Sequence, residues 1–172
     1  DTVKAARALV EAHPLPDDLT LKRLDANTPT ETFAAMAETA LSCGVLPAAR
    51  ASLSGTYGRG LCLVAEDRAG RVVTVAAASD YSHPDHALGA QAWWGMLATH
   101  PDRRGELLAL ILGAHAILEM DKEFGFTQFM TGVVSGNAAS EAVCMRMGLS
   151  PRGFSILGCA DPEAFSGGQM TK

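Results

Sequence analysis

Two apolar runs in the middle of the chain are joined by four turn-forming residues. The first run, GLCLVAE, covers residues 60–66, and the second, RVVTVAAAS, covers residues 71–79. Between them stands DRAG, a short polar stretch that contains a glycine. Two β-prone runs separated in this way predict a β-hairpin. The chain therefore contains an antiparallel β region, and its other segments must be arranged around that region.

Helix and strand signals continue on both sides of this hairpin. An amphipathic helix should end near His13, because Pro14 cannot continue it. The segment LTLKRL (19–24) alternates like a half-buried strand. The further elements that we expect are helices at 28–44, 46–55, 104–123 and 137–147, strands at 90–99, 126–134 and 153–159, and a strand fragment at 167–172. This order predicts an α/β fold with one sheet and helices on its faces.

Composition and charge narrow the classes of partner. The chain has 172 residues, 48% of them hydrophobic and 19% charged, so we expect a single folded domain over residues 1–172. Within it, residues 1–18 form an N-terminal helix and linker, and residues 19–172 form the core. The net charge is -5 and no block of lysines or arginines occurs, which argues against a nucleic-acid partner. No apolar stretch has the length of a membrane span, so we expect no membrane partner.

The cysteines indicate neither a metal site nor a disulfide framework. Cys43, Cys62, Cys144 and Cys159 are scattered without paired spacing. The first residues, DTVKAARALVEAHP, lack the basic-then-apolar order of a signal peptide. Both observations favour a reducing, cytoplasmic location.

The segment ATHPDRRGELLALIL (98–112) leads from a strand through a turn into a long apolar helix. The first amides of a helix have no internal partner, and the helix dipole adds positive charge there. Arg104 adds a full charge, and Gly105 allows close approach, so one interpretation is a phosphate or pyrophosphate site. The alternative is a helix that begins at Arg103 or Arg104 and is capped by Asp102. A nucleotide-binding P-loop and a GxGxxG dinucleotide motif are both absent.

Together with a second segment, this stretch resembles the GNAT superfamily of N-acetyltransferases. The family's coenzyme A segment has the form P-x-x-R-G-x-G-x-G/A, and here PDRRGELLA (101–109) stands in its place. Its later segment has an asparagine, small residues, often a tyrosine, and then Gly-Phe. The residues at those places are Asn137, Ala138, Ala139, Cys144, Gly148 and Leu149. The order of elements from about residue 20 to residue 157 also fits, so the resemblance covers most of the chain.

The resemblance implies a GNAT-like fold and an acetyl-coenzyme A site. The sheet should be mixed, mostly antiparallel and splayed at its centre, where Gly95 and Met96 suit the family's bulge. The strand end at Leu97, Ala98 and Thr99 should bind the pantetheine arm. The pyrophosphate should be held by Arg104, Gly105, Glu106, Leu107, Leu108 and Ala109, and the helix after Asn137 should flank the pantetheine.

Two residues depart from the family pattern. Leu107 replaces the usual middle glycine, so its side chain either crowds the phosphate or turns inward while its amide still binds. Cys144 stands where a tyrosine often protonates the departing thiolate. A thiol is able to do this work as the catalytic residue, and the alternative is a small buried cysteine that only packs.

The sequence does not identify the general base. The candidates lie in one loop, and the alternative interpretation, a solvated turn of polar residues, is favoured over a base: Asp80, Tyr81, His83, Asp85 and His86. His115, within the long helix, reads as a core-facing histidine. Trp93 and Trp94 are adjacent on one strand and should point to opposite faces, one into the core and one toward the acceptor.

The function that the resemblance implies is transfer of an acetyl group from acetyl-CoA to a primary amine of a small molecule or a protein. The amine attacks directly in a ternary complex, with no covalent enzyme intermediate. The acidic net charge of the chain favours a cationic acceptor. Two alternatives stay open: a non-catalytic acyl-CoA-binding sensor or interaction module, and a structural domain without a cofactor. The family often pairs through its late strands, which leaves a homodimer open as well.

Overall fold

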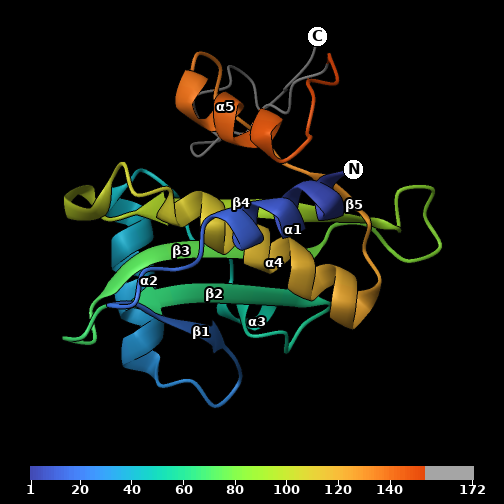
Figure 1. Cartoon of the computed structure of the whole chain (residues 1–172). Helices are drawn as coiled ribbons and strands as arrows, with labels where there is room; N and C mark the ends of the chain where they lie inside the picture. The colour runs from blue at the N-terminus through green and yellow to red at the C-terminus, as the bar shows by residue number, and fades with distance from the viewer. Residues whose placement is uncertain (154–172) are drawn as a thin grey trace, which may run out of the picture.

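The computed structural model describes residues 1–153, and its elements alternate along the chain as expected (Figure 1). The helices are α1 (Thr2–Ala12), α2 (Thr30–Ser42), α3 (Arg50–Leu53), α4 (Leu108–Phe124) and α5 (Ala138–Arg146), with a short 3-10 helix η1 at Pro101–Arg103. The strands are β1 (Thr20–Leu24), β2 (Gly60–Glu66), β3 (Val72–Asp80), β4 (Gln91–Thr99) and β5 (Gln128–Met130). The strands expected at 153–159 and 167–172, and Cys159, lie at or beyond the end of the described residues.

The five strands form one open sheet in the order β1-β2-β3-β4-β5. β1 to β4 pair antiparallel, and β5 joins β4 in parallel. The prediction of a single mixed, mostly antiparallel sheet is therefore confirmed. The hairpin is confirmed too, because β2 and β3 pair antiparallel on either side of the DRAG turn. The Asp67 carboxylate accepts the main-chain N–H groups of Ala69 and Arg71 at this turn.

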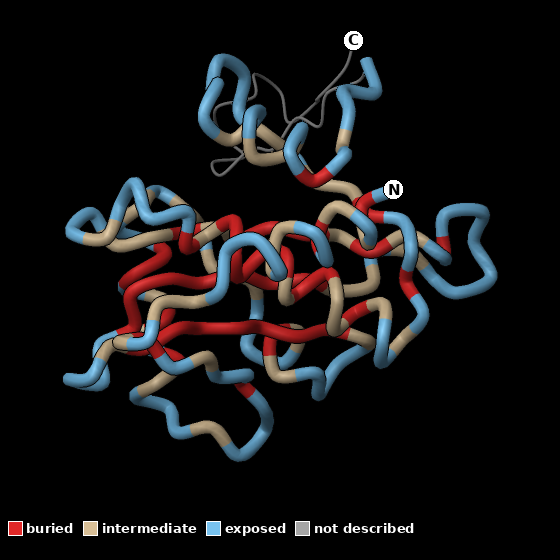
Figure 2. Tube along the Cα trace, in the orientation of Figure 1, coloured by how far each residue is buried: buried red, intermediate tan, exposed pale blue. Residues whose placement is uncertain are grey.

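Helices cover both faces of the sheet, as predicted. Every residue of β2 is buried (Figure 2). Its side chains alternate between two apolar clusters. Leu61 and Leu63 belong to the cluster beneath α1 and α4, whereas Cys62 and Val64 belong to the cluster beneath α2 and α3. A strand buried on both sides in this way needs a helical layer on each.

Several boundaries differ from the predictions, and the largest difference lies before α4. The helix expected from Arg104 begins at Leu108, because Gly105 and Leu107 adopt left-handed backbone conformations with φ of 87° and 61°. β5 is limited to Gln128–Met130, within the longer strand expected at 126–134. No helix within residues 1–153 combines the length and the apolarity that crossing a bilayer requires.

Candidate functional site

β4 contains a β-bulge at Met96. Ala98 pairs with Val75 and Gly95 pairs with Ala77, so β4 holds one more residue than β3 over this interval. Met96 takes the extra place with a left-handed φ of 53°. Residues two apart on a regular strand share a face, yet Trp94 belongs to the cluster beneath α4 and Met96 to the cluster beneath α2. The bulge expected at Gly95 and Met96 is thus confirmed, and it reverses the faces of the strand.

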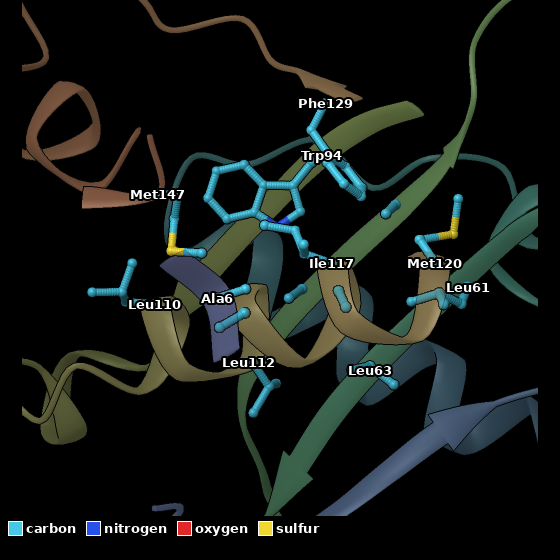
Figure 3. Packing of buried hydrophobic residues seen from close by; sticks show 14 of the residues in the cluster. Ala6, Leu61, Leu63, Trp94, Leu110, Leu112, Ile117, Met120, Phe129 and Met147 are labelled. Atoms are coloured by element: carbon cyan, nitrogen blue, oxygen red, sulfur yellow. The ribbon is translucent and has the colours of Figure 1, made fainter. Parts of the chain in front are cut away.

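The glycine before the bulge makes room for an aromatic ring. A Cβ at Gly95 would lie 2.6 Å from Cζ2 of Trp93, whose indole folds back over its own strand. Trp93 is half-buried against the cluster beneath α2, while Trp94 is fully buried beneath α4. Figure 3 shows the Trp94 indole beside Phe129 and Ile117. The prediction that these two tryptophans point to opposite faces is confirmed.

The far half of β4 extends beyond β5. Their pairing runs only from Gln91 to Trp93, because β5 ends at Met130, and the far half of β4 has no strand partner on that side within residues 1–153. The splay expected at the centre of the sheet stays a prediction. The N–H of His100 donates to the carbonyl of Val73 at 2.8 Å. Because main-chain groups alternate between the two edges of a strand, those of Thr99 point away from β3 toward the open edge. That edge is where an extended ligand adds as a further strand.

Side chains from two other elements hold this strand end. The buried hydroxyl of Thr74 lies 2.9 Å from the carbonyl oxygen of Ala98 and donates to it. The thiol of Cys43, at the end of α2, donates to the carbonyl of Thr99 with an Sγ–O distance of 3.2 Å. The sequence analysis missed both residues, since neither stands in a motif near β4.

The loop between β4 and α4 presents amides that no side chain caps. Leu107 is the N-cap residue of α4 and makes no side-chain capping bond. A left-handed residue followed by a helical one turns successive N–H groups to the same side, which forms an anion-binding nest. The alternative in which Asp102 caps this helix is wrong, because that carboxylate instead accepts from Nη1 of Arg71 at 3.2 Å.

The two arginines of this loop differ in their surroundings. The Arg103 guanidinium lies between the carboxylates of Asp18 and Glu106, and it lowers the pKa of both. Arg104 is exposed and forms no ion pair with any residue of the described segment 1–153. Arg104 is therefore the cation that is available beside the nest.

Leu107 is partly exposed and has a left-handed backbone. The residue is 36% exposed, and its φ of 61° favours glycine. Whether its side chain crowds the phosphate stays a prediction. The position needs a left-handed backbone, which gives a physical reason for a glycine there in related sequences.

The structure places the remaining predicted site residues on α5. Asn137 is its N-cap, and its Oδ1 accepts from the N–H of Ser140 at 3.1 Å. Cys144 packs, half-buried, against the cluster beneath α4, and burial raises the pKa of its thiol. Figure 1 shows α5 standing clear of the sheet. Leu97, Ala98, Thr99 and residues 104–109 lie together at one end of β4, and α5 is not packed along them.

The loop of candidate bases lies at the opposite end of the sheet (Figure 2). Asp80 ends β3, and its carboxylate accepts from the main-chain N–H of Arg59 at 3.2 Å. The Nδ1 atoms of His83 and His86 accept main-chain N–H groups inside their own turns. These bonds support the reading as a turn. His115 lies half-buried in α4, and burial lowers its pKa.

No cluster of histidine, cysteine, aspartate or glutamate side chains within residues 1–153 is suited to hold a metal ion. The site is thus an open strand edge, an amide nest and an adjacent arginine. This combination suits an extended ligand that ends in phosphate groups.

Comparison with known proteins agrees with this geometry. No protein family model matches the chain, and no curated protein matches its sequence. Three solved structures, 12–21% identical and covering 81–83% of this chain, share its fold with TM-scores of 0.60–0.61. One is a predicted acetyltransferase from Clostridium acetobutylicum with acetyl-CoA, which is 12% identical, is covered over 96% of its length and gives a TM-score of 0.60. The second is a tandem GNAT protein from the clavulanic acid biosynthesis pathway, which is 21% identical, is covered over 46% of its length and gives a TM-score of 0.60. The third is glucosamine-6-phosphate N-acetyltransferase from Arabidopsis thaliana, which is 12% identical, is covered over 99% of its length and gives a TM-score of 0.61. This chain has the fold of the GNAT acetyltransferases.

Proposed function

We propose that this chain is an acetyl-CoA-dependent N-acetyltransferase. The observation that carries the proposal is the uncapped nest before Leu108. It directly follows a strand that has no strand partner on its outer edge at Thr99 within residues 1–153. A thioester carrier with a diphosphate and an amide-containing arm fits both features at once. The shared fold with acetyltransferases, one of them crystallised with acetyl-CoA, supports the same ligand.

In this proposal the coenzyme lies along β4 and ends at α4. Its pantetheine amides pair with the main chain from Leu97 to Thr99, and its diphosphate meets the amides of residues 104–109. Arg104 contributes attraction from an exposed position beside the nest. Asn137 and the helix α5 flank the arm, as the family resemblance implies.

The transfer needs no covalent enzyme intermediate. The acceptor nitrogen attacks the thioester carbonyl, the carbon–sulfur bond breaks, and the coenzyme thiolate leaves with a proton while the amine loses one. The left-handed Met96 interrupts the regular ladder of β4, and a main-chain amide between Met96 and Ala98 is our candidate to stabilise the developing oxyanion. Cys144 is our candidate to protonate the thiolate, because its raised pKa keeps the thiol protonated at neutral pH.

The acceptor that we propose is a primary amine of a small molecule or a protein. Trp93, half-buried beside the bulge on the α2 side of the sheet, offers an apolar wall next to the reacting carbonyl. The net charge of -5 favours a cationic acceptor. The free thiols of Cys43, Cys62 and Cys144 suit the cytoplasmic location that we propose.

A second function is supported by the departures from the family pattern. Leu107 puts a partly exposed leucine where the family has a glycine, and Cys144 stands in the place of a tyrosine on a helix that stands clear of the sheet. Both features favour a domain that binds an acyl-CoA without turning it over. Such a domain would act as a sensor or as an interaction module.

Two measurements test the proposal in sequence. Coenzyme A at a saturating concentration should raise the melting temperature, since a ligand that binds only the folded state stabilises it. Release of free thiol from acetyl-CoA is then followed with a panel of primary amines. Turnover with any amine supports the enzyme, and binding without turnover supports the module. An unchanged melting temperature contradicts both.

A further inference from the structure

Arg103 is clamped between two carboxylates beside the nest. Its Nη1 donates to Oδ2 of Asp18 at 2.8 Å, and its Nε and Nη2 each donate to the Glu106 carboxylate at 2.7 Å. The Arg103 side chain is only 17% exposed. A guanidinium engaged on both sides has few donors left for a ligand. Arg103 is therefore a poor candidate to contact phosphate, although it stands next to Arg104.

The clamp joins two distant parts of the chain. Asp18 belongs to the linker between α1 and β1 and lies 85 positions before Arg103. Glu106 lies between Gly105 and Leu107, the two residues whose left-handed backbone shapes the nest. One end of the turn is thus tied through Arg103 to the linker, and the adjoining Leu19 is buried in the core.

We propose that Asp18 is a positioning residue for the diphosphate subsite. It acts through Arg103, which holds Glu106 and the intervening turn so that the amides before α4 converge. This inference rests on the proposed function and assigns the N-terminal segment a part in cofactor binding. It also separates the two arginines: Arg104 attracts the ligand, and Arg103 shapes the loop.

Positioning and simple electrostatics predict effects of opposite sign. Removal of a negative charge near an anion site strengthens anion binding if only Coulomb forces act. Loss of the Asp18 carboxylate also releases Arg103, which becomes a second phosphate ligand if only Coulomb forces act. If Asp18 acts by holding the loop, its removal weakens binding instead, because the amides must be ordered at the expense of binding free energy.

The experiment compares Asp18→Ala with Asp17→Ala in the full chain. Both variants lose one negative charge, but Asp17 is exposed, and its side chain makes no hydrogen bond or ion pair among residues 1–153, whereas Asp18 binds Arg103. Titration calorimetry with coenzyme A measures the affinity, and pantetheine, which lacks the diphosphate, serves as the second probe. Melting curves verify that each variant is folded at the temperature of the titration.

We expect Asp18→Ala to weaken coenzyme A binding by about threefold or more, to leave pantetheine binding unchanged, and to be rescued by Asp18→Glu. Asp17→Ala should bind coenzyme A as the wild type does, or slightly more tightly. Arg103→Lys keeps the positive charge but loses the planar guanidinium that binds both carboxylates at once. Its coenzyme A affinity should resemble that of Asp18→Ala.

Unchanged or tighter coenzyme A binding by Asp18→Ala overturns the inference, and so does an equal loss for both probes, which indicates a general structural defect. Should Asp18→Ala not fold, Arg103→Lys carries the same comparison. Failure of the wild type to bind coenzyme A contradicts the proposed function itself, and it is recognised before any variant is compared.

Discussion

The indole Nε1–H of Trp94 donates a 2.9 Å hydrogen bond to the main-chain carbonyl of Gly113 where β4 packs against α4. A Cβ on residue 113 would lie 2.6 Å from Cζ2 of that indole. The glycine in the middle of α4 therefore allows a fully buried tryptophan to lie directly against the helix. Because β4 and α4 carry the proposed coenzyme site, this contact is one of those that hold its two halves together.

Gly113→Ala should destabilise the protein although alanine is the better helix former. The helix propensity favours alanine by about 1 kcal/mol, but the added methyl group meets a ring that has no space to move, which costs about 1–3 kcal/mol. Denaturant unfolding measures the net loss. The same change in a Trp94→Phe background, where the contacting ring atom is missing, should cost clearly less. Equal losses in both backgrounds would show that the contact is not the cause.

Leu107→Gly should stabilise the protein by about 1 kcal/mol, because a left-handed backbone strains any residue with a Cβ. Leu107→Ala keeps the strain and provides the matched control, with little change expected. The midpoint of urea unfolding distinguishes them. Coenzyme A affinity should be equal or higher in the glycine variant, since glycine removes a side chain from the loop that we propose to bind the diphosphate. A lower unfolding midpoint for Leu107→Gly would mean that the leucine side chain contributes more than its strain costs.

Arg104→Glu should weaken coenzyme A binding about tenfold, because it reverses a charge beside the start of α4. The fold should be unaffected, since Arg104 is exposed. Arg7→Glu, at an exposed position on α1, makes the same change in net charge and should bind normally. The difference between the variants should shrink at higher salt concentration. Equal affinities would place the diphosphate elsewhere.

Cys144→Ala should lower kcat by about a hundredfold, the typical contribution of a positioned acid, and leave the KM for acetyl-CoA unchanged. The thiol must be protonated to donate, and burial raises its pKa. The kcat of the wild type should therefore hold through neutral pH and fall as the pH rises past that raised pKa. The alanine variant should lack this alkaline decline. Equal kcat values for the two proteins would show that Cys144 is not the acid that protonates the departing thiolate.

Predictions that depend on local pattern were confirmed. The β2–β3 hairpin follows from two apolar runs and a turn, and the opposed tryptophans follow from strand alternation. The glycine before the bulge signalled a close approach within β4, and the approaching group is Trp93. Each of these features involves residues close together in the chain, which is the range over which periodicity and turn chemistry act.

The start of α4 was predicted wrongly, because it depends on residues that are far apart in the chain. Nothing in the residue type of Leu107 favours a left-handed backbone, and Asp102 has the chemistry of a helix cap. Asp102 is instead engaged by Arg71, which lies 31 positions earlier in the chain. The positions of Cys144 and Asn137 relative to the coenzyme are still predictions.

The sequence by itself determined the kind of fold and singled out the segment that we propose to bind the ligand, because hydrophobic periodicity and glycine placement are properties of short stretches. Tertiary structure decided which groups are available there: it engaged Arg103 with Asp18, left Arg104 exposed, and turned the main chain of Thr99 toward an open edge. Those outcomes depend on partners brought together by packing, and no local pattern records a partner that lies 85 residues away.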